Sequence, residues 1–169
     1  AMLTGAALFA GFHCNELLMK LLARHDPHPR LFDAYAQTLP ALALRDDAGV
    51  QAALRAFEFV LLKEIGVLPD LSLLTSTQRA VGERDRLRLL PEAGVAEARP
   101  GDAGLAGSVL IGLQAALDHG SVAALRQACS VALPELKTAS RALLHYHLGT
   151  PVMRTRQVVI DLQALAALP

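Results

Sequence analysis

Apolar residues recur at spacings of three and four over much of the chain, a pattern typical of helices that bury one face. The first stripe predicts a helix over residues 6–24. Pro27 and Pro29 end this helix, because proline does not fit a helix interior. A second helix is expected from Arg30 onward, and Pro40 should kink or end it.

Helix-capping residues divide the rest of the pattern into further helices. A third helix should begin after Asp46 or Asp47, since a short acidic side chain accepts hydrogen bonds from the first-turn amides, and should end at Gly66. Four more helices are expected towards the C-terminus: over residues 105–119, after a cap at Ser121, over residues 136–148, and from Thr155.

The helical pattern lapses over residues 68–104. Residues 86–89 alternate between arginine and leucine, Pro91–Gly94 resembles a turn, and residues 95–98 alternate weakly. Alternation on both sides of a turn predicts a β-hairpin. The expected fold is therefore mainly α, an irregular helical bundle with a small β-hairpin insertion.

Length and composition narrow the class of protein. A chain of 169 residues that is 53% hydrophobic can bury one substantial core. It has no apolar run of the roughly 18 residues needed to cross a membrane, and no basic segment precedes its first apolar stretch. We expect a cytoplasmic protein with no membrane contact. Because the chain enters its first helix almost at once, we also expect it to be part of a longer protein.

Candidate chemistry is sparse. The two cysteines, Cys14 and Cys129, cannot supply a disulfide framework or a four-cysteine metal site. The histidine pairs His25/His28 and His145/His147 lack partners at metal-ligand spacing. The glycines of residues 101–107 have no lysine-serine ending of a phosphate loop, and no serine nucleophile elbow occurs. The sequence predicts no catalytic residue, no metal and no cofactor.

Charge is balanced overall but unevenly distributed. The chain has 16 Lys+Arg and 16 Asp+Glu, yet residues 134–156 hold four cations and one anion. Arg154 and Arg156 flank a helix start, where free amides and basic side chains can bind phosphate; an ordinary solvated helix start is an equally good interpretation. The candidate DNA-binding residues are Lys137, Arg141, Arg154 and Arg156.

Several segments, taken in order, resemble the C-terminal helical domain of the RecO family of bacterial DNA repair proteins. They lie within residues 3–169: Phe-His-Cys-Asn-Glu-Leu-Leu at 12–18, Leu-Phe-Asp-Ala-Tyr at 31–35, Leu-Arg-Ala-Phe-Glu at 54–58, Leu-Leu-Lys-Glu-Ile-Gly at 61–66, Leu-Gly at 148–149 and Arg-Thr-Arg at 154–156.

The resemblance implies a non-enzymatic recombination mediator of the RecF pathway. Such proteins bind single- and double-stranded DNA, anneal strands, and work with RecR to load RecA onto DNA coated by single-strand-binding protein (SSB). The family's N-terminal OB-fold is absent from this chain, so its DNA binding should be weak. Many members have a cysteine-rich zinc element where residues 68–94 lie here; residues 72–82 contain no cysteine, so no zinc is expected.

The resemblance also implies binding of the SSB C-terminal tail, an acidic stretch closed by an apolar residue and a free carboxylate. Its receptor needs an apolar pocket with a cation at the rim. We expect Arg55 to be that cation and the second and third helices to supply the apolar surface, namely Leu31, Phe32, Tyr35, Leu54, Phe57 and Leu61. The acidic residues Asp46, Asp47 and Glu58 count against this site if they share its face.

Two interpretations stay open beside this one. Arg55 could be an ordinary surface arginine whose stem covers the core. The chain could also be a helical regulatory module that holds a small apolar ligand between its helices.

Overall fold

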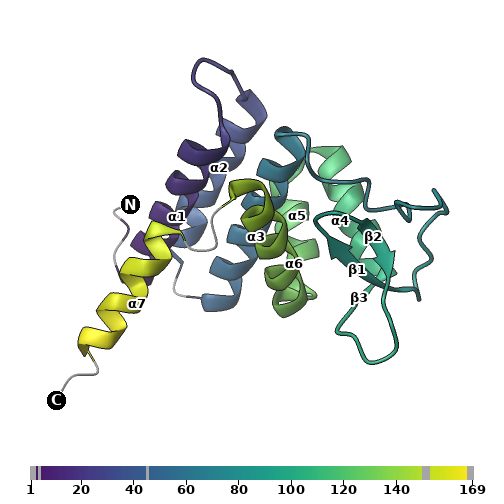
Figure 1. Cartoon of the computed structure of the whole chain (residues 1–169). Helices are drawn as coiled ribbons and strands as arrows, with labels where there is room; N and C mark the ends of the chain where they lie inside the picture. The colour runs from purple at the N-terminus through teal and green to yellow at the C-terminus, as the bar shows by residue number, and fades with distance from the viewer. Residues whose placement is uncertain (1–2, 4, 45, 150–152, 167–169) are drawn as a thin grey trace.

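The computed structural model of the chain describes residue 3 and residues 5–44, 46–149 and 153–166. The described chain is mainly α-helical, with a small antiparallel sheet at one end (Figure 1). Its helices are α1 (Gly5–Leu21), α2 (Pro29–Leu42), α3 (Asp47–Glu64), α4 (Gly107–His119), α5 (Val122–Ser130), α6 (Leu133–Leu148) and α7 (Arg154–Ala166). The expected fold class is confirmed.

Helix α3 is the centre of the bundle. It contacts α1, α2, α5 and α6, and every side chain from Ala52 to Phe59 is buried. A helix that is buried all round has no solvent face, so its sequence shows no clean polar stripe. Asp46 caps it as expected, accepting hydrogen bonds from the amides of Ala48 (3.1 Å) and Gly49 (3.0 Å).

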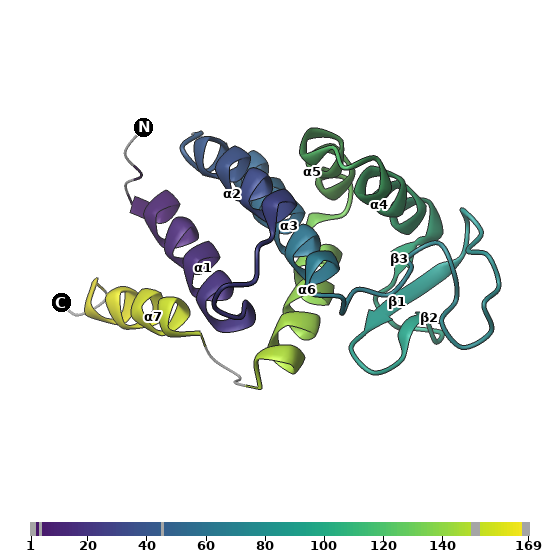
Figure 2. The same cartoon turned by 90° about the horizontal axis from the view of Figure 1, so that it is seen from above.

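Helices α1 and α2 lie on one side of α3, and α7 packs against α1 (Figure 2). Pro29 is tolerated in the first turn of α2, where its missing N–H has no helical partner to lose. The helix continues through Pro40 and ends at Leu42, so this proline stands close to the end it was expected to mark.

The sheet lies at the end of the molecule opposite α7 (Figures 1 and 2). Strands β1 (Arg86–Leu90) and β2 (Gly94–Glu97) form the expected hairpin, whose turn places Gly94 at φ 65°. A third strand, β3 (Leu105–Ala106), pairs with β1 on its other edge. The expected helix over 105–119 therefore begins two residues late, because Leu105 pairs with Leu87 before α4 starts.

Candidate functional site

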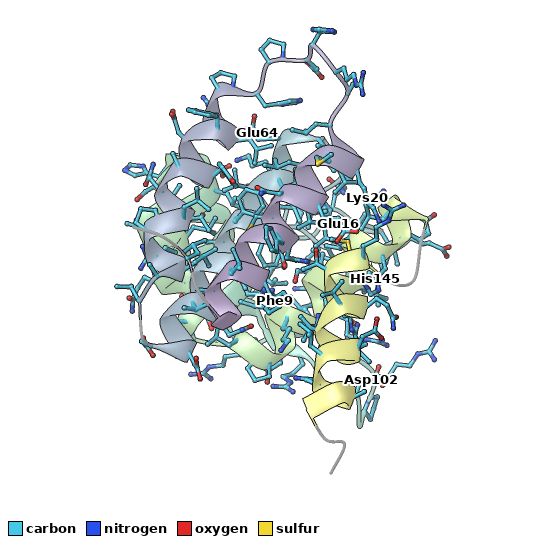
Figure 3. All side chains as sticks on the ribbon, turned by 90° about the vertical axis from the view of Figure 1, so that its left-hand side faces the viewer. Phe9, Glu16, Lys20, Glu64, Asp102 and His145 are labelled. Carbon is cyan, nitrogen blue, oxygen red and sulfur yellow. The ribbon has the colours of Figure 1, made fainter. Side chains whose placement is uncertain are left out.

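A groove between α1, α6 and α7 combines apolar walls with basic side chains. Its volume is about 260 Å³. Figure 3 labels Phe9 and His145, which line it from α1 and α6. The basic members are His13, Arg141, His145 and Arg156, and the others are Phe9, Ala10, Leu17, Gln51, Leu54, Leu144, Leu148, Met153, Thr155 and Val159. No acidic residue lines it among the residues that the structure describes.

Glu16 fixes the α7 wall of this groove. One carboxylate oxygen accepts the Arg154 amide at 2.8 Å, and the other accepts the Thr155 amide at 2.9 Å and the Thr155 hydroxyl at 2.7 Å. Lys20 lies 2.9 Å from the same carboxylate, near the start of α7 (Figure 3). Glu16 thus caps a helix from another part of the chain, where its negative charge also suits the positive end of the helix dipole.

The protonation of Glu16 reflects these bonds. Burial alone would raise the pKa of Glu16, but the Thr155 and Arg154 amides, the Thr155 hydroxyl and Lys20 together lower it to about 2. The carboxylate is therefore charged at neutral pH and holds α7 in place.

The cations of the groove repel one another. Burial lowers the pKa of His145, and the charges of Arg156 and Arg141 lower it further. Burial and Arg156 likewise lower the pKa of Arg141, and burial and Arg141 lower that of Lys137, one turn earlier on α6. A group of like charges beside an apolar wall favours an anionic ligand, which would relieve the repulsion.

A buried ion pair lies behind the groove. Arg55 and Glu58 are 4% and 1% exposed, and Arg55 Nη2 donates to Glu58 Oε1 at 2.8 Å. His13 Nε2 lies 3.1 Å from the same oxygen, and His13 is the member of this cluster that reaches the groove. Burial would raise the pKa of Glu58, but Arg55 and His13 keep it below its usual value.

The expected position of Arg55 at the rim of an open pocket is wrong. Its side chain lies in the core because α3 is enclosed on all sides, and Glu58 pairs with it there. Among the expected apolar partners, Leu31, Leu54, Phe57 and Leu61 are also buried. Phe32 is 69% exposed, and the Tyr35 hydroxyl donates to Asn15 at 2.6 Å. A role of this set in partner binding stays a prediction.

The four expected DNA-binding residues separate into two groups. Arg141 and Arg156 line the groove, and Lys137 lies close enough for their charges to act on it, whereas Arg154 does not line the groove. The first amides of α7, which were expected to be free to bind phosphate, are not free. The Glu16 carboxylate already accepts the Arg154 and Thr155 amides.

His28 and the two cysteines are the remaining candidates for a metal or nucleophilic site. His28 lies 3.3 Å from Asp26 and 3.9 Å from Glu64, but the described residues hold no group of three metal-ligating side chains. Burial raises the pKa of Cys14 and of Cys129 to about 12, so both thiols are unreactive. None of the described helices is both long and apolar enough to span a bilayer.

A second hollow lies between α1 and α2. It measures about 610 Å³, and none of the described residues that line it is charged; its lining includes Leu8, Phe12, Tyr35, Leu39 and Pro40. This hollow is where the alternative of a small apolar ligand would apply.

Sequence reasoning missed Glu16, His13 and His145 as site residues. The spacing of 138 residues between Glu16 and Arg154 gives no local signal for a cap. The one available sign was that Glu16 and Arg154–Arg156 both belong to the segments that carry the family resemblance.

Comparisons of the sequence with a family model and with individual proteins point to the same family. The family model "Recombination protein O C terminal" matches residues 2–156. Proteins named DNA repair protein RecO from Albidiferax ferrireducens and Polaromonas sp. are 46% and 49% identical over 165 and 164 residues. The match covers 96% of this chain and 66% of each relative, so the chain spans just under two thirds of their length.

Proposed function

The chain belongs to the RecO family, and we propose that it is the non-catalytic helical part of a cytoplasmic DNA repair and recombination mediator. In this role it binds the acidic tail of SSB and, weakly, single- and double-stranded DNA. Together with RecR it would aid RecA loading and strand annealing. The family name supports the repair role, and the α1–α6–α7 groove supports the binding role.

The α1–α6–α7 groove is the proposed binding site of the SSB tail. An apolar C-terminal side chain fits among residues such as Leu144, Leu148 and Val159. Its free carboxylate fits Arg141 and Arg156, because guanidinium groups hold carboxylates with paired, charge-assisted hydrogen bonds. This site replaces the one expected around Arg55, which is buried.

The same cations support weak DNA binding. Lys137 and Arg141 lie one turn apart on α6, and Arg156 approaches them from α7. Three cations can contact neighbouring phosphates without reading base sequence, so the binding should be indifferent to sequence and sensitive to salt.

The tail site is tested with a fluorescent SSB tail peptide and two matched variants. Arg156→Ala should weaken binding about tenfold to a hundredfold, the usual range for one charge-assisted hydrogen bond (about 1.5–3 kcal/mol). Arg154→Ala removes the same charge from another exposed position of the same helix, one that does not line the groove. It should bind almost as wild type.

Fluorescence anisotropy and thermal unfolding should be measured on all three proteins. Equal binding by wild type and Arg156→Ala, with unchanged melting temperatures, would place the tail elsewhere. Equal losses in both arginine variants would indicate general charge attraction rather than a site.

A further inference from the structure

Resting on the proposed tail site, we propose that the buried Arg55–Glu58 pair positions His13 as a proton-linked receptor for the peptide carboxylate. Binding of an acidic peptide with a free C-terminal carboxylate then takes up a proton. A single carboxylate oxygen has two partners: Glu58 Oε1 accepts from Arg55 Nη2 at 2.8 Å and lies 3.1 Å from His13 Nε2.

The chemistry of Glu58 decides which ring nitrogen of His13 carries hydrogen. An ionised carboxylate only accepts hydrogen bonds, and Arg55 keeps the pKa of Glu58 low although burial opposes it. His13 Nε2 must therefore donate, so the neutral ring has a bare lone pair at Nδ1. Among the described residues no hydrogen-bond partner is found for Nδ1.

That second nitrogen is the one left for a ligand in the groove. His13 lines the groove, its side chain is 27% exposed, and its Nε2 is turned to Glu58. A neutral Nδ1 repels a carboxylate, because both present lone pairs. Protonated Nδ1 donates to it instead, so a bound carboxylate favours the charged ring.

The charged groups around His13 either favour or oppose its protonated ring. Glu58 of α3 favours the imidazolium, and Arg55 beside it offsets part of that effect. Arg141 of α6 and Arg156 of α7 oppose it across the groove, as does His145 of α6 when it is protonated. The Glu16 carboxylate, one turn along α1, already pairs with Lys20 and accepts hydrogen bonds from the α7 amides. A carboxylate bound between His13 and the two arginines would offset their charge, so its binding is expected to bring a proton.

The buried Arg55–Glu58 pair fixes the position of the His13 ring. Arg55 and Glu58 cannot reach solvent, and the Arg55 Nε and Nη1 and Glu58 Oε2 atoms have no hydrogen-bond partner in the described structure. Replacing a buried ion pair with apolar side chains is often neutral or stabilising. The contact of Glu58 with His13 therefore suits a positioning role for this pair better than a role in stability.

The test is calorimetric titration of the chain with a synthetic acidic peptide that ends in phenylalanine with a free carboxylate. Titrations run at pH values from about 8 to about 6, above the range in which the peptide's own carboxylates titrate. For one proton taken up, affinity should rise by up to about tenfold per pH unit as pH falls. At a fixed pH, the measured heat should vary with the ionisation enthalpy of the buffer.

Three histidine variants locate the proton. His13→Gln keeps an N–H donor for Glu58 but cannot titrate, so it should bind with little pH dependence. His119→Gln, an exposed residue at the end of α4, should keep the wild-type pH profile. His145→Gln removes the other groove histidine and should keep most of the profile. A peptide with an amidated C-terminus should show weak binding and no proton uptake.

The outcomes separate this inference from the proposed function. Tight binding without proton uptake in wild type would overturn the role of His13 and leave the tail site standing. Proton uptake that survives in His13→Gln but disappears in His145→Gln would also overturn it. Absence of peptide binding at every pH would overturn both.

Discussion

Glu16 shows how one side chain can attach a whole helix. Its two carboxylate oxygens accept three hydrogen bonds from the start of α7, whose Val158, Ile160 and Leu162 remain 45–48% exposed. An element with so much exposed apolar surface gains little from burial, so its docking depends heavily on this cap.

Replacing Glu16 should therefore destabilise α7. Glu16→Gln should cost about 1–3 kcal/mol at neutral pH, the range for a helix cap with charged hydrogen bonds. Because folding lowers the pKa of Glu16 from 4.5 to about 2, its stabilisation is fully present above pH 4.5 and is lost as pH falls towards 2. Thermal unfolding across this pH range should show the two proteins converging in acid.

The control for this prediction is Glu92→Gln. Glu92 is exposed in the hairpin turn, and no hydrogen-bond partner is found for it in the described residues. It should unfold as wild type at every pH. An equal effect of both substitutions would mean that net charge, rather than the cap, causes the change.

Arg55 shows the limit of reading a helix from its apolar stripe. Its place beside the apolar residues of the third helix predicts a position at the rim of a pocket, but α3 is enclosed by neighbours that lie far away in sequence. Glu58, three residues later, was weighed as a repelling neighbour and is in fact its buried partner. An opposite charge one turn away in an otherwise apolar helix was the sign that the pair could be buried.

At the level of elements, local signals predicted most of what the structure contains. Helices α1, α2 and α3, the caps at Asp46 and Ser121, and the β1–β2 hairpin follow from side-chain periodicity and turn residues. Strand β3 and the groove could not be predicted this way. Both depend on which distant segments meet: β3 on its pairing with β1, the groove on the attachment of α7 to α1.

Two glycines of α4 should respond in opposite ways to the same substitution. A Cβ on Gly107 would collide with the carbonyl of Gly82 and crowd Val81, so Gly107→Ala should destabilise the fold by about 1–3 kcal/mol. Nothing lies near a Cβ on Gly112 in the helix interior, so Gly112→Ala should stabilise it by about 0.5–1 kcal/mol.

Chemical denaturation of both variants checks this pair. Because both substitutions add one methyl group to the same helix, a difference in sign isolates the close approach of α4 to residues 81–82. A stabilised Gly107→Ala would mean that this contact yields without cost.

At the scale of the whole molecule, balanced charge makes the basic groove a local feature. With 16 cations and 16 anions the chain has no net charge to attract DNA from a distance, so we expect any phosphate binding to depend on a local cluster, proposed to be Lys137, Arg141 and Arg156. Two of these, Arg141 and Arg156, are also the proposed partners of the SSB tail carboxylate. One small set of cations is thus assigned to two polyanionic ligands.

Sharing these cations predicts competition between the ligands. Each phosphate contact to single-stranded DNA contributes about 0.7 to the slope of log affinity against log salt. The double variant Arg141→Ala, Arg156→Ala should lower that slope by about 1.4 and weaken tail binding. Arg84→Ala, which removes an exposed cation two residues before β1, should change neither. In wild type, unlabelled tail peptide should displace a labelled single-stranded oligonucleotide. An uncharged version of the peptide should not, which separates direct competition from a general effect. Simultaneous binding of peptide and oligonucleotide at their separate affinities would show that the two ligands occupy different surfaces, and only one of them could then depend on Arg141 and Arg156.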